Sequence, residues 1–202
     1  MRKAIFELLV VLGAVAMIGA SPVRAQTEQA TRVVGVVERV DGANMVVKTA
    51  TATTEVKVAP SATMFALVKA SLDDVKTGTF IGVGATPQAD GSQRAIRLVI
   101  FPESMRGLGE GHRPWDRPGT TMTNATVDTS VTSVDGRMLT VRYKGGEQKI
   151  VIGPESALLT YVTADKSELK PGANVTINGV IAPGGAIEAR RIVVDRSGQV
   201  AK

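Results

Sequence analysis

Apolar and polar residues alternate with a period of two along most of the chain after residue 31. This period is typical of half-buried β-strands. Asp-Gly, Gly-Gly and Pro-Gly pairs interrupt the alternation, and such pairs favour tight turns between strands. We therefore expect two series of five strands each. The predicted strands lie at 32–40, 44–49, 54–58, 79–86 and 93–101, and at 127–134, 138–143, 148–152, 174–181 and 187–194.

The two series are copies of one unit. Val40-Asp41-Gly42 recurs as Val134-Asp135-Gly136, which is 94 residues further on. An alignment of 33–101 with 127–195 needs no gap and contains 15 identities in 69 positions. Because the turn glycines match as well, the sequence indicates an internal duplication.

The alternation also predicts which side chains form the core. In the second, fourth and fifth strands of each copy, every other residue is apolar and points to one face. In the first strand of the second copy, Val127 and Val131 share such a face. The other expected core residues are Met45, Val47, Ile81, Val83 and Leu98, and Leu139, Val141, Val175, Ile177 and Ile192.

The order of elements predicts an all-β fold. Three strands, a crossover and two strands is the order of a five-stranded OB-type barrel. We expect two tandem OB-like barrels at 31–102 and 124–196, each folding alone, with a short helix or irregular crossover between strands 3 and 4. Packed half-sandwiches have the same strand count and stay open as an alternative. Residues 103–123 predict an irregular Gly/Pro/Arg-rich linker, and 197–202 a tail.

Residues 1–25 have the layout of a secretory signal peptide. Arg2 and Lys3 precede an apolar run from 5 to 20, and Ala25 ends a typical cleavage site. A retained membrane anchor is the alternative, because the run approaches the length that spans a bilayer. We expect removal, a periplasmic protein and no membrane span in the remaining chain.

Composition restricts the partners and the chemistry. The net charge of +5 falls by 2, to about +3, when Arg2, Lys3, Arg24 and Glu7 leave with the signal, so a nucleic-acid partner is not expected. The chain has no cysteine and one histidine, His112, and no nucleophile–base arrangement follows from the strands. We therefore expect no enzyme activity and no cofactor. The oligomeric state stays open.

The linker carries the most distinctive residues. His112, with Glu110 or Asp116, could hold a divalent cation, but one imidazole and two carboxylates make a poor metal site, and none is predicted. Trp115 is expected to bury its ring on one of the barrels and so fix the linker. Asp41 and Asp135 precede glycine at predicted hairpins, so a role in the turn is expected for both.

A comparison of the two copies predicts a contact surface. The first copy has Val34, Val36 and Phe80 where the second has polar residues, and Gly82 and Gly84 follow Phe80. Since first and fourth strands are neighbours in an OB barrel, the three apolar side chains should form one outward patch beside a shallow depression. We expect the linker with Trp115, or the second barrel, to cover it.

The signal peptide, the paired Val-Asp-Gly turns, the steps Val75-Lys76-Thr77-Gly78 and Leu169-Lys170-Pro171-Gly172 and the terminal Ala-x-Arg strands together resemble a known group. The chain is similar to a bacterial domain-of-unknown-function family of exported OB-like repeats, whose members are often labelled metal transporter permeases. The resemblance implies a fold and a compartment. A permease is not expected, because it needs several membrane spans.

The expected function is a non-catalytic envelope module that binds a protein or polymer. The alternative is a periplasmic protein that binds a small ligand or divalent cation through residues 110–116. These two functions differ in where the ligand would contact the chain.

Overall fold

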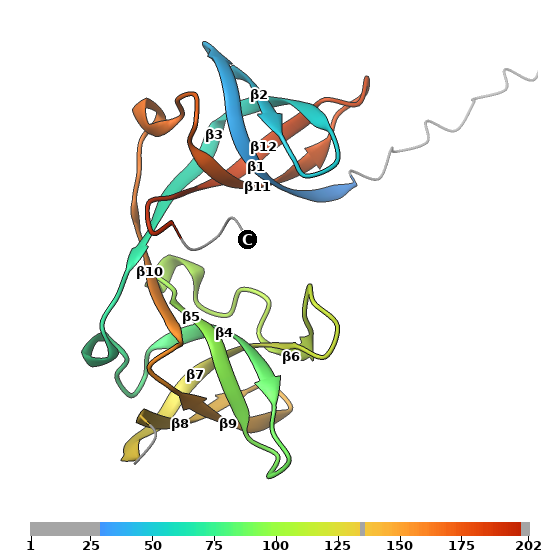
Figure 1. Cartoon of the computed structure of the whole chain (residues 1–202). Coiled ribbons are helices and arrows are strands. Elements are labelled where there is room, and N and C mark those ends of the chain that lie inside the picture. Colours follow the sequence, from blue (N-terminus) through green and yellow to red (C-terminus); the bar gives the residue numbers. More distant parts are fainter. Residues whose placement is uncertain (1–28, 134–135, 199–202) are drawn as a thin grey trace, which may run out of the picture.

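The computed structural model describes residues 29–133 and 136–198, and these residues form an all-β fold with short 3₁₀ helices (Figure 1). The predicted signal peptide 1–25 and the predicted turn residue Asp135 lie outside the described residues, as does most of the predicted tail. The helices are η1 (Leu72–Asp74), η2 (Glu103–Met105) and η3 (Lys166–Glu168). The strands are β1 (Ala30–Asp41), β2 (Asn44–Lys48), β3 (Thr53–Lys69), β4 (Phe80–Pro87), β5 (Gln93–Ile100), β6 (Gly111–Pro114), β7 (Thr121–Ser133), β8 (Gly136–Tyr143), β9 (Gly146–Ile152), β10 (Ala157–Thr163), β11 (Asn174–Ile181) and β12 (Ile187–Asp195).

Five strands close into a barrel, which we call the first barrel. Its strands pair in the order β11-β1-β2-β3-β12, and β12 pairs with β11 to complete the ring. The closing pair of β12 and β3 is parallel and runs from Ile187↔Val56 to Asp195↔Leu67. Closure leaves no free sheet edge between these strands, which excludes an open half-sandwich here.

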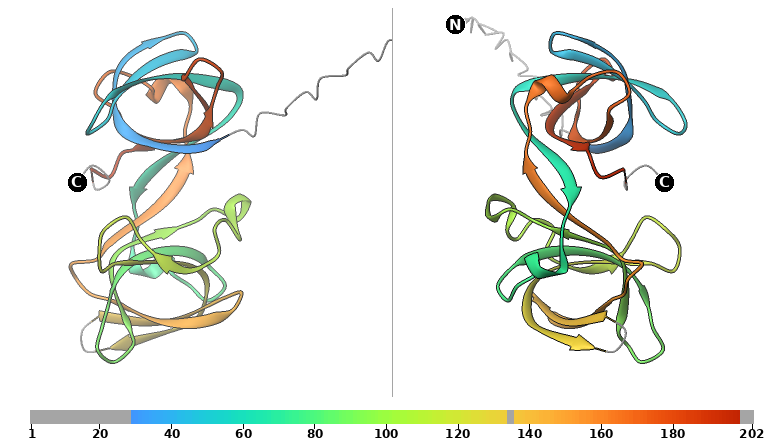
Figure 2. Two further views of the ribbon diagram at one scale, coloured as in Figure 1. Left: turned by 90° about the vertical axis from the view of Figure 1, so that its right-hand side faces the viewer. Right: turned by 60° about the vertical axis from the view of Figure 1, so that its left-hand side comes forward.

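The strands β5, β4, β7, β8 and β9 form a second unit. They pair in that order, and β6 adds to the edge of β7. The two outer strands, β5 and β9, also pair in parallel at Gln93↔Ile150 and Arg94↔Val151. Figure 2 shows this unit below the first barrel, joined to it by two extended segments.

Each unit takes strands from both copies of the repeat. The first barrel combines β1–β3 of the first copy with β11 and β12 of the second, and the second unit combines β7–β9 with β4 and β5. The hydrophobic cores follow the same division, because one gathers residues 33–58 with 169–194 and the other 75–100 with 125–152. The expectation that 31–102 and 124–196 are separate barrels is therefore wrong. The fold has the form of a strand-exchanged dimer within one chain.

The predicted core residues of the second, fourth and fifth strands are buried. Each of the ten exposes 2% or less of its surface, and Ile81, Val83, Leu98, Ile177 and Ile192 expose none. The period of two thus predicted the inner face of these strands correctly.

Val131 is the exception among the expected inward residues. Val127 is 1% exposed, but Val131 is 62% exposed. A bulge between Val127 and Thr129 shifts the register of β7 against β8, and a shift by one residue turns the next side chains to the opposite face.

The crossover is mostly extended, and in each copy it includes the predicted short helix, η1 or η3, before the fourth strand. In the first copy β3 simply continues to Lys69, and in the second β10 covers the equivalent stretch before the short helix η3. These two segments pair antiparallel from Phe65↔Thr163 to Lys69↔Leu159, which satisfies their backbone groups between the units. Leu67 and Leu159 are buried there together with Val193.

The linker is more regular than its composition suggests. β7 begins at Thr121, and β6 pairs with its first four residues. Gly107 and Gly109 before β6, and Gly111 at its start, all have positive φ, so the chain turns sharply as it enters β6. Among the described residues, no helix has the length and apolar composition needed to cross a membrane.

Candidate functional site

The structure brings together three of the four predicted binding residues. Val34 and Val36 lie on the outer face of β1, 38% and 37% exposed, and they line one pocket together with Trp115. Phe80 does not belong to this surface, because it is 2% exposed and its ring packs 5.5 Å from that of Phe101. The predicted patch of Val34, Val36 and Phe80 is therefore wrong.

Strand exchange explains this error. The neighbour of β1 is β11 of the second copy, so Val34 pairs with Thr176 and Val36 with Asn174. Phe80 lies on β4 in the other unit, where it pairs with Thr126. First and fourth strands are indeed neighbours, but they come from different copies.

The depression predicted at Gly82 and Gly84 of β4 is present, and two aromatic side chains of the same chain occupy it. A side chain at Gly84 would overlap the six-membered ring of Trp115, and one at Gly82 would overlap the ring of Phe101. Trp115 is half-buried there, and the guanidinium carbon of Arg97 lies 5.1 Å from its ring centroid. The expectation that Trp115 packs on one of the units is met at this surface.

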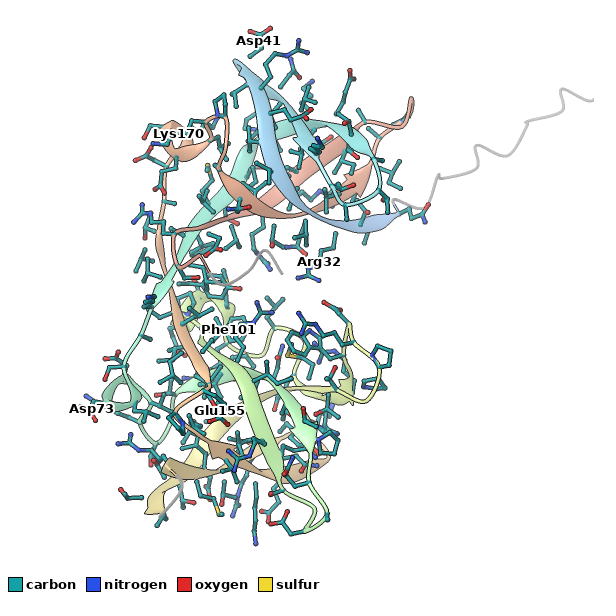
Figure 3. The ribbon with its side chains drawn as sticks, viewed as in Figure 1. Arg32, Asp41, Asp73, Phe101, Glu155 and Lys170 are labelled. Carbon is teal, nitrogen blue, oxygen red and sulfur yellow. The ribbon has the colours of Figure 1, made fainter. Side chains whose placement is uncertain are left out.

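The cleft between the first barrel and the second unit consists of two adjoining pockets. The inner pocket has a volume of about 390 Å³ and the outer pocket about 820 Å³. Trp115, Arg97, Arg32 and Asp116 line both, so the ring of Trp115 lies where the two pockets meet. In Figure 3, Arg32 extends from the first barrel toward the second unit, and Phe101 lies on the second unit, across the cleft from Arg32. We call the two pockets together the inter-unit cleft.

The inner pocket lies on a pseudo-two-fold axis of the duplicated chain. Leu67 of β3 pairs with Tyr161 of β10, its own counterpart 94 residues later. On either side of this contact, Arg97 pairs with Ala157 and Arg191 pairs with Thr63. Each of these two pairs becomes the other when every residue is replaced by its counterpart in the other copy. The axis therefore relates Arg97 to Arg191, and both arginines line the inner pocket.

The cleft is rich in cations. The carboxylates at its wall are engaged, since Asp116 pairs with Arg32 at 3.1 Å, Glu155 pairs with Arg94 at 2.8 Å, and Asp195 accepts hydrogen bonds from Ser197. Cations outnumber carboxylates in the lining, so the cleft attracts anions. The cationic lining residues are Arg32, Lys48, Arg97, Arg113, Arg117 and Arg191, and the acidic ones are Asp116, Glu155 and Asp195.

Burial and charge shift two pKa values in the cleft. Burial, and then the charge of Arg32, lower the pKa of Arg97, because both disfavour its cationic form. Burial raises the pKa of Tyr161, while Arg97, Arg191 and Arg32 act in the opposite direction by stabilising its phenolate. The phenol of Tyr161 therefore lies within the electrostatic field of three arginines.

Asn124 of β7 also lines the inner pocket. Its side-chain amide donates to the Leu108 carbonyl at 2.9 Å, but its Oδ1 is buried and accepts no hydrogen bond within the described protein. The residue is 6% exposed. A buried acceptor of this kind needs a donor from a water or a ligand to offset its desolvation.

The polar side chains of the linker point to different partners. Glu110 accepts from the Lys144 backbone N–H at 2.9 Å, His112 Nδ1 lies 2.8 Å from Thr123 Oγ1, and Asp116 pairs with Arg32. Within residues 29–133 and 136–198 no three histidine or carboxylate side chains gather as metal ligands do. This arrangement gives the cation-binding alternative no geometric support.

The arginines and Tyr161 were not predicted as site residues. The one available signal was the repeated Ala-x-Arg strand, in which Arg97 and Arg191 are identical and outward in both copies. Inward identities follow from the need to pack a core, whereas an outward cation retained in both copies has no such cause.

Gly84→Ala is expected to displace Trp115. The added methyl would overlap the indole, and overpacking of this kind costs about 1–3 kcal/mol. Trp115 is the single tryptophan of the chain, so its emission should move to longer wavelength as the ring enters water. Thr132→Ala, at an exposed position of β7 away from both pockets, is the control and should leave the spectrum unchanged. Unchanged emission in Gly84→Ala would contradict the packing of Trp115 on Gly84.

Comparison with known protein families, curated proteins and solved structures gives no match to this chain.

Proposed function

We propose that this chain is a non-catalytic, exported module of the cell envelope that binds a polymer or an extended protein segment in the inter-unit cleft. The observation that carries the proposal is the cleft itself, whose inner and outer pockets hold about 390 and 820 Å³ and adjoin at Trp115. Ligand sites are commonly concave, lie at domain interfaces and combine apolar surface with a few placed polar groups.

The shape of the cleft favours an extended ligand. The outer pocket runs along Val34 and Val36 of β1 and past Ile96 of β5, and the inner pocket continues beyond Trp115 to Tyr161. A chain-like molecule lying in both pockets would contact the apolar strip, the indole and the arginines in succession. A small ligand would fill only one of them.

A binding role fits the groups in the cleft better than catalysis. Its ionisable side chains are arginines, one lysine, one tyrosine and carboxylates. Asp116 forms an ion pair with Arg32 and Glu155 one with Arg94, and Arg97 lies against the ring of Trp115. Covalent catalysis would need a nucleophile held beside a base, and the described lining residues offer no such pair. We therefore propose no enzyme activity and no cofactor.

We also propose that both units are OB-like barrels. The ring of the first barrel, numbered by position in the repeat, has the order 1-2-3-5-4, and the second unit repeats this order. Such barrels bind oligosaccharides and oligonucleotides through outer strand faces. This proposal, with export to the periplasm, agrees with the resemblance to the exported repeat family of unknown function.

Trp115 fluorescence offers a direct test of cleft binding. Full-length protein would be titrated with polygalacturonate as an anionic polymer, with poly-glutamate as an anionic peptide and with dextran as a neutral polymer. We expect a saturable change with an anionic polymer and none with dextran. Arg142→Ala, on the exposed surface of β8 away from the cleft, is the control and should bind like the unchanged protein. Absence of a saturable change with every polymer would contradict the proposal.

A further inference from the structure

Three arginines from different strands line the inner pocket together with Tyr161. Arg97 belongs to β5, Arg191 to β12 and Arg32 to β1, and all three act electrostatically on the phenol of Tyr161. Their convergence requires the fold, because they are far apart in sequence and come from both copies of the repeat. Charged side chains of one sign normally separate in space unless something between them compensates.

The chain itself compensates this charge only in part. Asp116 pairs with Arg32, and Arg97 lies against the indole of Trp115. Among the described residues, no carboxylate forms an ion pair with Arg97 or Arg191. Within the described ranges, the two guanidinium groups related by the pseudo-two-fold axis thus face the inner pocket without forming an ion pair, and Asp116 and Asp195 offset the charge of Arg97 only from a distance.

The unpaired acceptor in the same pocket is an independent sign of a ligand. Asn124 Oδ1 is buried without a donor. It lies beside Gly82, and Asn124, Gly82 and Phe101 all line the inner pocket. An anion alone would not satisfy this acceptor. A ligand that carries both an anionic group and a hydroxyl or N–H group would satisfy the arginines and Asn124 together.

We propose that Arg97, Arg191 and Arg32 form a subsite for one anionic group, a carboxylate or a phosphate, of a hydroxyl-bearing ligand, with Trp115 packing against the body of that ligand. Guanidinium groups match the geometry of carboxylate and phosphate oxygens in paired hydrogen bonds. Within a partly buried pocket these charge-assisted bonds are stronger than at an open surface. The proposal rests on the proposed function in placing the ligand in the cleft.

Small anions test the subsite without a polymer. Full-length protein would be titrated with galacturonate, inorganic phosphate and neutral galactose, followed by Trp115 fluorescence and by calorimetry. We expect saturable binding of galacturonate or phosphate and none of galactose. Tighter galacturonate binding would identify a carboxylate as the group bound, and tighter phosphate binding a phosphate. The absence of saturable binding by both anions would overturn the subsite.

Variants separate the subsite from the cleft. Arg97→Ala and Arg191→Ala should each weaken binding of the preferred anion at least tenfold, Arg191→Lys should restore part of it, and Arg142→Ala should leave it unchanged. Thermal unfolding of each variant checks that it is folded, and Arg191→Lys supplies a milder change if Arg191→Ala is not. If polygalacturonate binds Arg97→Ala and Arg191→Ala as tightly as the unchanged protein, the subsite is wrong while the proposed function stands. Failure of every polymer on the unchanged protein refutes the proposed function instead.

Discussion

Ile177→Ala is expected to lower the free energy of unfolding by about 2–5 kcal/mol. Ile177 has no exposed surface and packs in the core of the first barrel, where it pairs with Val33 of β1. The substitution removes three methylene-sized groups and leaves a cavity among side chains from both copies of the repeat. Because small domains have only about 5–15 kcal/mol of stability, the loss would be a large share of the total.

Ile181→Ala is the matched control for this prediction. Ile181 lies on the same strand, β11, but is 41% exposed. Its truncation should change stability by less than about 1 kcal/mol, since surface substitutions are usually small in effect. Urea unfolding followed by circular dichroism measures both. Equal losses in the two variants would show that the inner face of β11 has been misassigned.

A single copy of the repeat, residues 121–198, is expected to form a dimer. In the full chain, β11 and β12 complete a barrel with β1–β3, while β7–β9 receive β4 and β5. An isolated copy lacks those partner strands, and a second molecule can supply their equivalents by the same exchange. The extended pairing of β3 with β10 would then be formed between two β10 segments.

Light scattering on the purified fragment measures this directly. The expected mass is twice that of the fragment, with a melting temperature that rises with concentration. A monomer that melts cooperatively at a concentration-independent temperature would show that one copy can close on itself. That outcome is the one expected from the sequence alone.

Strand positions and the core followed from the sequence because they depend on local alternation. The expected strand at 174–181 matches β11, and the expected strands at 93–101 and 187–194 differ from β5 and β12 by one residue. Their inward residues, among them Leu98 and Ile192, are fully buried. The alternation failed at the bulge after Val127 and in the crossovers of both copies, where β3 runs on to Lys69 and β10 forms an additional strand.

The exchange of strands could not be predicted, because the two copies have the same local pattern. Both copies present equivalent fourth and fifth strands, so Ile81 and Val175 are equally suitable for either core. The choice depends on whether the crossover folds back or extends, and residues 59–69 gave no local signal for this. Pairing of Leu67 with Tyr161 stabilises the extended form, and this contact joins segments 94 residues apart.

Part of the candidate site was visible in the sequence. Val34 and Val36 stood out as apolar residues where the other copy is polar, and Trp115 as a costly side chain to expose. The paired glycines of β4 predicted a depression, which Trp115 and Phe101 fill. Arg32, Arg97 and Arg191 were not predicted, because surface arginines are common and only the exchanged fold brings these three to one pocket.

The central claim is that ligand binds in the inter-unit cleft. Nuclear magnetic resonance of the arginine side-chain Nε–H groups, recorded while polygalacturonate is added to the full chain, measures the location of binding directly. We expect the signals of Arg97, Arg191 and Arg32 and the indole N–H of Trp115 to shift together and saturate, while that of Arg142 stays in place. A saturating shift of Arg142, with the cleft signals unchanged, would place the ligand on the outer surface of the second unit and contradict binding in the cleft.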